Sequence, residues 1–261
     1  MNKPALITGA SSGIGKELSH LHAERGGDLI LVARREEKLN ELKAALEEKY
    51  SVEVLVIAKD LSDPGAAGEL YDAMKAEGIE LEFLINNAGF GGHGRFHERD
   101  WQEELAMIQL NVMALTELCH RFLPDFVERT SGRILNVSST ASIPPGGPLQ
   151  SVYFATKHYV TALSYGIAEE LRGTGVTVTT LLPGATESEF AQRSGMEKTK
   201  LFSRTASARS VAEDGYNAMR AGKLKVVSGL PLSQKVLMTL IPFLPKKLLL
   251  SQIKEMQSSS T

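Results

Sequence analysis

The sequence predicts an α/β fold, in which a doubly wound parallel sheet of about seven strands carries helices on both faces. Short apolar runs alternate with longer amphipathic runs along most of the chain. Several of the short runs are continuously hydrophobic, as expected of strands that are buried on both faces. No Pro-, Gly- or Ser-rich linker and no shift in composition divides the 261 residues. We therefore expect one domain.

The expected strands and helices alternate along the chain. This order indicates parallel strands joined by right-handed crossovers. Ligands of such sheets bind outside the carboxyl ends of the strands, so the loops that follow the strands form the candidate site. The expected strands are Ala5–Thr8, Leu29–Ala33, Val52–Ala58, Leu81–Asn86, Arg133–Val137, Val176–Leu182 and Lys225–Val227. The expected helices lie near residues 13–25, 36–49, 64–77, 99–129, 151–172 and 208–221.

Composition and charge set limits on the partners and the compartment. Hydrophobic residues make up 43% and charged residues 23% of the chain, which is ordinary for a globular protein with a sizeable core. The formal net charge of −2 gives no reason to expect a nucleic-acid partner. A strand begins close to Met1 and no run of about 20 apolar residues occurs, so we expect a cytoplasmic protein without a signal peptide or membrane span. The single cysteine, Cys119, is expected in a helix core.

A glycine-rich loop joins the first strand to the first helix. It reads Thr8-Gly-Ala-Ser-Ser-Gly-Ile-Gly15, with the spacing G-x-x-x-G-x-G instead of the common G-x-G-x-x-G. Glycines here allow a sharp turn and a close approach of a pyrophosphate to the backbone, with the helix dipole facing the anion. A glycine-rich turn without a ligand is the alternative. The candidate cofactor-binding residues of this loop are Gly9, Ser11, Ser12, Gly13, Ile14 and Gly15.

The end of the second strand predicts the choice of cofactor. NAD enzymes of this architecture usually place an acidic residue about 20 positions after the glycines, where it binds the ribose 2′-hydroxyl. This sequence has Arg34 and Arg35 there. Arginine recognises phosphate through paired hydrogen bonds, so the two residues favour NADP(H) over NAD(H). Solvated arginines without a ligand are the alternative.

Tyr153 and Lys157 are one helical turn apart and follow a strand that ends in Ser138-Ser139. A phenol has a pKa of about 10, and an ammonium group one turn away favours the phenolate. The pair is therefore suited to proton transfer near neutral pH. Tyr71 and Lys75 have the same spacing, but they lie in a charged amphipathic stretch with no serine-bearing strand before it. We interpret that second pair as part of a helix surface.

Taken together, these motifs resemble those of the short-chain dehydrogenase/reductase family, in its subgroup of single-domain enzymes. The likeness extends over about residues 4–230. It implies a Rossmann-type fold and an oxidoreductase that transfers a hydride between a nicotinamide and a carbonyl or carbinol carbon. The motifs that carry it are Thr8-Gly-Ala-Ser-Ser-Gly-Ile-Gly15, Asp60-Leu61, Asn86-Asn-Ala-Gly89, Asn111 in Leu-Asn-Val, Ser139, Tyr153-x-x-x-Lys157 and Pro183-Gly184.

The resemblance implies four catalytic residues. Tyr153 would exchange the proton on the substrate oxygen, and Ser139 would hydrogen-bond that oxygen. Lys157 would hold the nicotinamide ribose hydroxyls and lower the pKa of Tyr153, and Asn111 would hold a water that connects Lys157 to solvent. Ser139 lies fourteen positions before Tyr153, one more than is usual in the family. Ser138 or Ser142 is therefore an alternative hydroxyl.

The resemblance also implies cofactor contacts in the loops after the third, fourth and sixth strands. Asp60 and Leu61 would contact the adenine, and the loop that begins at Asn86 would lie near the adenosine ribose. The alternative for Asn87 is a purely structural role. Thr186 would meet the nicotinamide carboxamide, with Ser188 as the alternative. The implied contacts, beyond the glycine loop and the arginines, are Asp60, Leu61, Asn86, Asn87, Ala88, Gly89, Tyr153, Lys157, Pro183, Gly184 and Thr186.

The expected substrate is a small carbonyl or alcohol compound in an apolar pocket. The loops at residues 90–97, 140–151 and 188–207 would form its walls. Cations in the last of these loops could favour an anionic substrate, but we prefer a solvated loop. His93 and His97 are four positions apart in a glycine-rich loop without a third ligand, so no metal site is expected. The aromatic and aliphatic pocket candidates are Phe90, Phe96, Ile143, Leu149, Phe190 and Phe202.

The likeness fades after residue 230. Residues 1–230 are expected to form an NADP-binding Rossmann-type catalytic domain, and residues 231–261 a C-terminal amphipathic helical extension of the same domain. Pro242 and Pro245 would divide this extension into two short apolar helices. Packing over the substrate pocket or the protein's own core is the preferred interpretation, followed by a subunit interface. Contact with a membrane surface is the least favoured of the three.

Two classes of function remain. The first is an NADP-dependent oxidoreductase, expected to be a homodimer or homotetramer. The second is a non-catalytic regulatory protein that senses NADPH and binds a protein partner on the same scaffold. A sensor would need the glycines and Arg34, but it would not need Ser139, Tyr153 and Lys157. The sequence therefore favours the enzyme.

Overall fold

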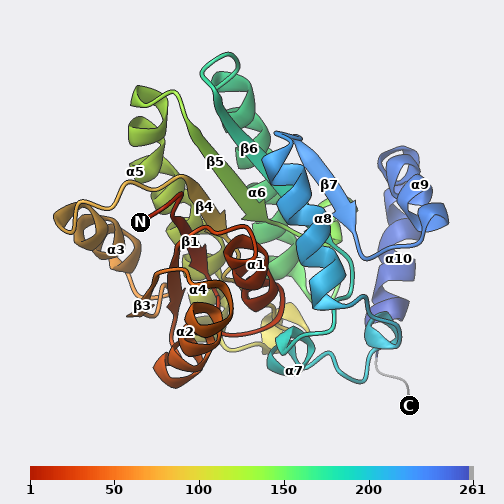
Figure 1. Cartoon of the computed structure of the whole chain (residues 1–261). Helices are drawn as coiled ribbons and strands as arrows, with labels where there is room; N and C mark the ends of the chain where they lie inside the picture. Colours follow the sequence, from red (N-terminus) through yellow and green to blue (C-terminus); the bar gives the residue numbers. More distant parts are fainter. Residues whose placement is uncertain (259–261) are drawn as a thin grey trace.

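The computed structural model describes residues 1–258 and confirms the predicted α/β fold (Figure 1). Seven strands form one parallel Rossmann-type sheet in the order β3-β2-β1-β4-β5-β6-β7. The order reverses between β1 and β4, which places a crevice outside the carboxyl ends of these strands. The strands are β1 (Ala5–Thr8), β2 (Leu29–Ala33), β3 (Val54–Ala58), β4 (Phe83–Asn86), β5 (Gly132–Val137), β6 (Val176–Pro183) and β7 (Lys225–Ser228).

Helices cover both faces of the sheet (Figure 1). The α-helices are α1 (Gly13–Ala23), α2 (Glu36–Tyr50), α3 (Ala66–Ala76), α4 (Trp101–Ile108), α5 (Leu115–Glu128), α6 (Ser151–Glu170), α7 (Phe190–Ser194), α8 (Ala208–Arg220), α9 (Leu232–Leu240) and α10 (Lys246–Gln257). Shorter helical turns are η1 (Phe96–Glu98), η2 (Gln109–Ala114), η3 (Thr140–Ser142), η4 (Lys200–Phe202) and η5 (Ile241–Phe243). None of the helices within residues 1–258 is long and apolar enough to cross a membrane.

Alternate side chains of each strand enter two separate cores, as a sheet with helices on both faces requires. Ile7 of β1 packs into the core formed with α1, α2 and α8. Its neighbour Leu6 packs into the core formed with α3, α5 and α6. In β2, Leu31 packs into the first of these cores and Ile30 into the second. The continuous apolar runs of the sequence thus reflect burial on both faces.

The expected strands are confirmed, with ends that differ by one or two residues. β3 begins at Val54 instead of Val52, and β4 begins at Phe83 instead of Leu81. Val52 and Leu81 are nevertheless buried, because the connections that lead into these strands also pack against the cores. The apolar residues therefore predicted burial correctly, but they placed the start of these two strands two residues too early.

The expected helix over 99–129 forms a single helical run from Trp101 to Glu128 that contains a π-helical segment, η2. Such segments widen the helix by one residue and often occur at functional sites. Cys119 lies in the buried part of this run, as expected, and burial raises the pKa of its thiol to about 12. Tyr71 and Lys75 both reach Asp125 of α5, so this pair joins two neighbouring helices.

His22 of α1 is a buried histidine that ties three parts of the chain together. Its Nδ1 lies 2.8 Å from the hydroxyl of Tyr216 in α8, and its Nε2 lies 2.9 Å from the carbonyl oxygen of Lys3. Burial lowers the pKa of His22 to about 4. The neutral imidazole is therefore the form that the fold stabilises.

We expect His22 to make the fold sensitive to mild acid. Because the pKa in the folded chain lies below the unfolded value of 6.5, the stabilisation is complete above pH 6.5 and is lost as the pH falls toward 4. The shift corresponds to roughly 3 kcal/mol of unfolding free energy. Urea unfolding at several pH values should show a flatter profile for His22→Gln than for the parent, whereas His97→Gln, at an exposed histidine, should keep the parent profile. Parallel profiles for parent and His22→Gln would contradict this role.

Candidate active site

A cavity of about 690 Å³ lies at the carboxyl ends of the strands. The glycine loop after β1, the arginines after β2, and the loops after β4, β5 and β6 all line it. The start of α6, α7 and the C-terminal helices complete its walls. The cavity therefore lies where the sequence predicts the site, at the loops that follow the strands.

The glycine loop is packed too closely for side chains. Gly9 has a φ of +68°, and a Cβ atom there would lie 2.8 Å from Nδ2 of Asn87. A Cβ at Gly15 would collide with the carbonyl oxygen of Gly9. Gly13 also has positive φ, and its Cβ would lie 2.9 Å from Cβ of Ser188. These contacts expose backbone toward the cavity at the beginning of α1, which fits a bound pyrophosphate.

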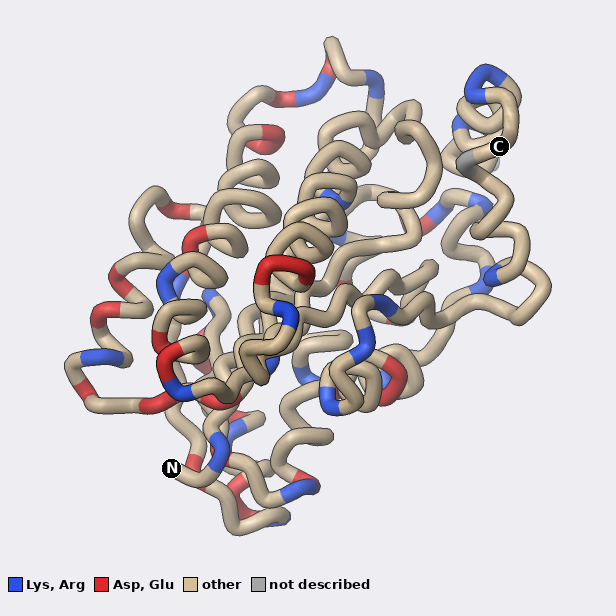
Figure 2. The backbone as a smooth tube through the Cα atoms, turned by 90° about the horizontal axis from the view of Figure 1, so that it is seen from above, with Lys and Arg blue, Asp and Glu red and all other residues tan. Residues whose placement is uncertain are grey.

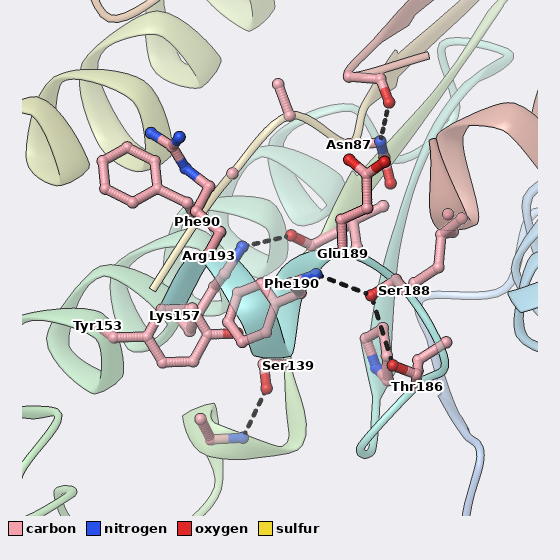
Figure 3. A pocket seen from close by; sticks show the side chains of 18 of the residues that line it. Asn87, Phe90, Ser139, Tyr153, Lys157, Thr186, Ser188, Glu189, Phe190 and Arg193 are labelled. Carbon is pink, nitrogen blue, oxygen red and sulfur yellow. Dashed lines mark hydrogen bonds between the residues drawn. The ribbon is translucent and has the colours of Figure 1, made fainter. Parts of the chain in front are cut away.

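Asn87 holds the glycine loop against the end of β4. Its side chain donates to the carbonyl oxygen of Thr8 at 2.9 Å, and Thr8 Oγ1 accepts from the backbone N–H groups of Asn87 and Ala88. Figure 3 shows the Asn87 side chain at this edge of the cavity. Asn86 is different, because its side chain points into the core and donates to Oδ1 of Asn136 at 2.9 Å. Asn87, Ala88 and Gly89 line the cavity, whereas Asn86 and Gly15 support it from behind.

Both arginines after β2 line the cavity and carry acidic partners. Nη1 of Arg34 lies 3.6 Å from Oδ2 of Asp60. Nη2 of Arg35 lies 2.7 Å from Oε2 of Glu189 and donates to Oγ of Ser11 at 3.0 Å. The hydrogen bond from Arg35 holds the pKa of Glu189 below its usual range. Nothing in the sequence pattern singled out Glu189, because its contact with Arg35 bridges segments far apart in the chain.

Tyr153 and Lys157 lie one turn apart at the start of α6 and are both buried. Figure 3 shows their side chains together with Ser139 and Phe190 in the cavity. Nζ of Lys157 donates to the carbonyl oxygen of Val137 at 2.9 Å and lies 5.8 Å from the centre of the Tyr153 ring. The ring of Phe190 lies 5.4 Å from that of Tyr153. The end of β5 therefore anchors the lysine beside the phenol.

The protonation of this pair differs from the expectation that Lys157 lowers the pKa of the phenol. Burial raises the pKa of Tyr153 to about 12, and only the hydrogen bond with Ser139 opposes that rise. Burial also lowers the pKa of Lys157 to about 8. The ammonium group is directed at the Val137 carbonyl, so desolvation outweighs its attraction for the phenolate.

The three candidate serines have different surroundings. Oγ of Ser138 donates to the carbonyl oxygen of Lys157 at 2.9 Å. Oγ of Ser142 donates to the carbonyl oxygen of Ser139 and accepts from Thr161. Ser138 and Ser139 both line the cavity, and Ser139 accepts from the backbone N–H of Ala141 at 3.1 Å. Of the three serines, only Ser139 lowers the pKa of Tyr153 against the effect of burial. Ser138 and Ser142 are thus occupied in holding the loop.

Asn111 lies behind Lys157, within the π-helical segment. Its amide exchanges two hydrogen bonds with the backbone of Phe90, at 3.1 and 2.9 Å, and donates to Thr156 of α6 at 3.2 Å. A Cβ at Gly89 would lie 3.0 Å from Oδ1 of Asn111 and 3.4 Å from Nζ of Lys157. Asn111 therefore joins the loop after β4 to α6.

The substrate side of the cavity is largely apolar. Phe90, Phe190 and Phe202 line it as expected, whereas Phe96, Ile143 and Leu149 do not. The guanidinium carbon of Arg193 lies 4.3 Å from the centre of the Phe90 ring. The sequence pattern did not show several further lining residues, which are Phe154, Met196, Met238, Ile253, Met256 and Gln257.

The histidines considered for metal binding have other contacts. Nε2 of His93 lies 2.8 Å from the carbonyl oxygen of Gln257, and His97 lies next to Glu98 on the surface. Residues 1–258 contain no group of three or more His, Cys, Asp or Glu side chains that could hold a metal ion.

Comparison with known proteins agrees with this geometry. Residues 3–199 match the short chain dehydrogenase family. The 7beta-hydroxysteroid dehydrogenase of Collinsella aerofaciens is 34% identical over 181 residues, which are 69% of this chain and 68% of that protein. A short-chain dehydrogenase from Sphingobium yanoikuyae, solved in complex with NADPH, has a TM-score of 0.83 at 30% identity over 98% of both chains. The bulky-bulky ketone specific alcohol dehydrogenase from Comamonas testosteroni has a TM-score of 0.79 at 27% identity over 98% of this chain and 97% of that one.

The chain belongs to the short-chain dehydrogenase family. It is an NAD(P)-binding oxidoreductase that acts on alcohol and carbonyl groups.

Gly89→Ala tests how tightly the loop after β4 holds Lys157. The new methyl group would press on Asn111 and Lys157, so we expect turnover to fall severalfold or more while the melting temperature changes little. Gly166→Ala is the matched control, because a Cβ at that position of α6 would meet nothing within 4 Å. Equal turnover of the parent and Gly89→Ala would show that the contact does not restrain the lysine.

Proposed function

We propose that the chain is an NADP-dependent oxidoreductase that transfers a hydride between NADP(H) and a carbonyl or secondary alcohol, with Tyr153 as general acid and base. The observation that carries the proposal is the shared cavity. Ser139, Tyr153 and Lys157 line the same space as the glycine loop and Arg34 (Figure 3). A dinucleotide along the glycine loop would therefore reach the buried phenol.

The cofactor would be held by residues from every loop at this edge of the sheet. When bound, the nicotinamide supplies or accepts the hydride. Gly9 and Gly13 would leave room for the pyrophosphate, and Asp60 and Leu61, which line the same cavity, would contact the adenine. Pro183, Gly184 and Thr186 line the opposite end, where they would meet the carboxamide. Lys157 would hold the ribose hydroxyls between them.

Tyr153 would transfer the proton, and Ser139 would assist it. With a pKa raised to about 12, the phenol carries its proton at neutral pH and is prepared to donate it to a carbonyl oxygen. Ser139 would orient that oxygen, and Asn111, behind Lys157, would extend the proton path toward solvent. The protonated phenol is the form that reduction of a carbonyl requires.

NADP is proposed as the preferred cofactor because two guanidinium groups lie at the end of β2. Arg34 has only a long ion pair, and both arginines are about half exposed, so a phosphate can reach them. The carboxylate of Glu189 would compete with the 2′-phosphate for Arg35. The NADPH complex of the Sphingobium relative is consistent with this choice.

The substrate proposed is a bulky apolar ketone or alcohol. Aromatic and thioether side chains form the wall opposite the cofactor side of the cavity. The relatives named for hydroxysteroids and for bulky ketones support this class. The C-terminal helices contribute Met238 and Ile253 to the wall, which supports assigning residues 231–258 to the same domain.

Tyr153→Phe tests the enzyme against a non-catalytic NADPH sensor. Loss of the phenolic proton should lower kcat for ketone reduction by at least about 100-fold, with NADPH still bound, because general acid catalysis contributes this much or more. NADPH consumption over a panel of ketones measures turnover, and fluorescence titration measures binding. Turnover equal to the parent would overturn the mechanism.

Two serine variants test whether Ser139 or Ser142 supplies the hydroxyl that orients the substrate oxygen. Ser139→Ala should lower kcat tenfold or more, since Ser139 alone of the three contacts the phenol, whereas Ser142→Ala should retain most of the activity. The reverse order would move the role to Ser142.

Glu189→Gln tests the arginine side of the cofactor site. Removing the carboxylate frees Arg35 and removes a negative charge from the expected position of the 2′-phosphate, so NADPH should bind severalfold more tightly while NADH binding changes less. Glu187→Gln removes the same charge two residues earlier and serves as the control. If both variants change NADPH affinity alike, the effect is one of overall charge and not of competition for Arg35.

A further inference from the structure

The C-terminal helices expose an unusual number of large apolar side chains. Phe243 is 84% and Leu232 78% exposed, and four further side chains are more than half exposed. Leu232, Val236, Leu240 and Phe243 follow the spacing of one helix face. Single exposed apolar residues are normal, but a contiguous group of this kind marks an interaction surface. This outer C-terminal face consists of Leu232, Val236, Leu237, Leu240, Phe243 and Leu248.

The opposite side of the same helices faces the cavity and the protein interior. Met238 lines the cavity, and it lies about 200° around α9 from Val236 and from Leu240. In α10, Leu249 and Ile253 are buried while Leu248 is exposed. Figure 1 shows α9 and α10 next to each other at the β7 end of the molecule. The preferred sequence interpretation, packing over the pocket, therefore accounts for the inner side only.

Cations outnumber acids in α9 and α10, which hold Lys235, Lys246, Lys247 and Lys254 against the single acid Glu255. No Asp or Glu occurs from residue 215 to residue 254, although the whole chain has a formal net charge of −2. Lys246 and Lys247 are exposed beside Phe243 and Leu248. Figure 2 shows lysines on this pair of helices near the C-terminal end. The seven cations of this stretch are Arg220, Lys223, Lys225, Lys235, Lys246, Lys247 and Lys254.

A second copy of the chain would fit this face poorly. In a two-fold symmetric contact the same surface meets itself, so the lysines of α9 and α10 would enter the contact from both copies, with Glu255 as the single acid of these helices to pair with them. Lysine is also depleted at the centres of protein interfaces. An anionic lipid surface accepts the apolar side chains and attracts the lysines at the same time.

We propose that the outer C-terminal face docks the protein onto an anionic lipid surface. Leu240 and Phe243 would enter the boundary between head groups and acyl chains, and the lysines would lie at the level of the lipid phosphates. The helices lie on the surface without spanning it, in agreement with the lengths of α9 and α10. The proposal does not depend on the reaction proposed above.

Vesicle co-sedimentation of the full chain tests this proposal. The parent should sediment with vesicles that mix phosphatidylcholine and phosphatidylglycerol, and weakly with phosphatidylcholine alone. Added salt should weaken binding, because surface charges are screened. The double variant Leu240→Ser, Phe243→Ser should lower the bound fraction at least tenfold, and Lys246→Glu with Lys247→Glu should lower it severalfold and reduce its salt dependence.

The control pair is Trp101→Ser with Met113→Ser, which removes exposed apolar side chains from α4 and η2 and should leave vesicle binding unchanged. Ketone turnover and melting temperature of each variant in solution show that the fold is retained. A parent chain that stays in the supernatant, or a Leu240, Phe243 variant that still sediments, would overturn the proposal. A dimer in solution that this variant dissociates, without any vesicle binding, would assign the face to a second copy instead.

Discussion

Desolvation of a phenol and an ammonium group on one turn of α6 is the constraint on which the rest of the site depends. Burial moves both pKa values toward the neutral forms, to about 12 for Tyr153 and about 8 for Lys157. The lysine keeps its position through the Val137 carbonyl, and the hydroxyl of Ser139 lowers the pKa of the tyrosine against burial. Both partners come from the end of β5, so the carboxyl edge of the sheet determines where the reactive oxygen lies.

A second set of contacts keeps the loops around the cavity in place. Thr8 and Asn87 bind the glycine loop to the loop after β4, and Asn111 binds that loop to α6. Ser138 and Ser142 share Thr161 and hold the turn that presents Ser139. Buried polar groups of this kind are costly unless every partner is present. The short polar side chains after each strand therefore serve the geometry of the site as much as its chemistry.

The sequence was informative wherever a local pattern decides the outcome. Apolar runs predicted all seven strands, and Ser139, two residues after the end of β5, is the serine that lowers the pKa of Tyr153. Burial, however, is a property of the folded chain, so the raised pKa of Tyr153 opposed the effect expected from its spacing to Lys157. Asn86 faces the core and Glu189 reaches Arg35 across more than 150 residues of sequence. Contacts of that range leave no periodic signal in the chain.

The short helix α7 connects the two halves of the site. Glu189, at its N-cap, pairs with Arg35 beside the glycine loop, and the next residue, Phe190, packs its ring 5.4 Å from that of Tyr153 and 6.3 Å from that of Phe202. Glu189 and Phe190 are adjacent at the start of α7, so a phosphate that drew Arg35 away from Glu189 would also affect the aromatic wall beside the phenol. Cofactor recognition and enclosure of the substrate would then be coupled through two neighbouring side chains. Closure of the apolar pocket would follow occupation of the arginine side, which is the order that protects a reactive carbonyl site from water.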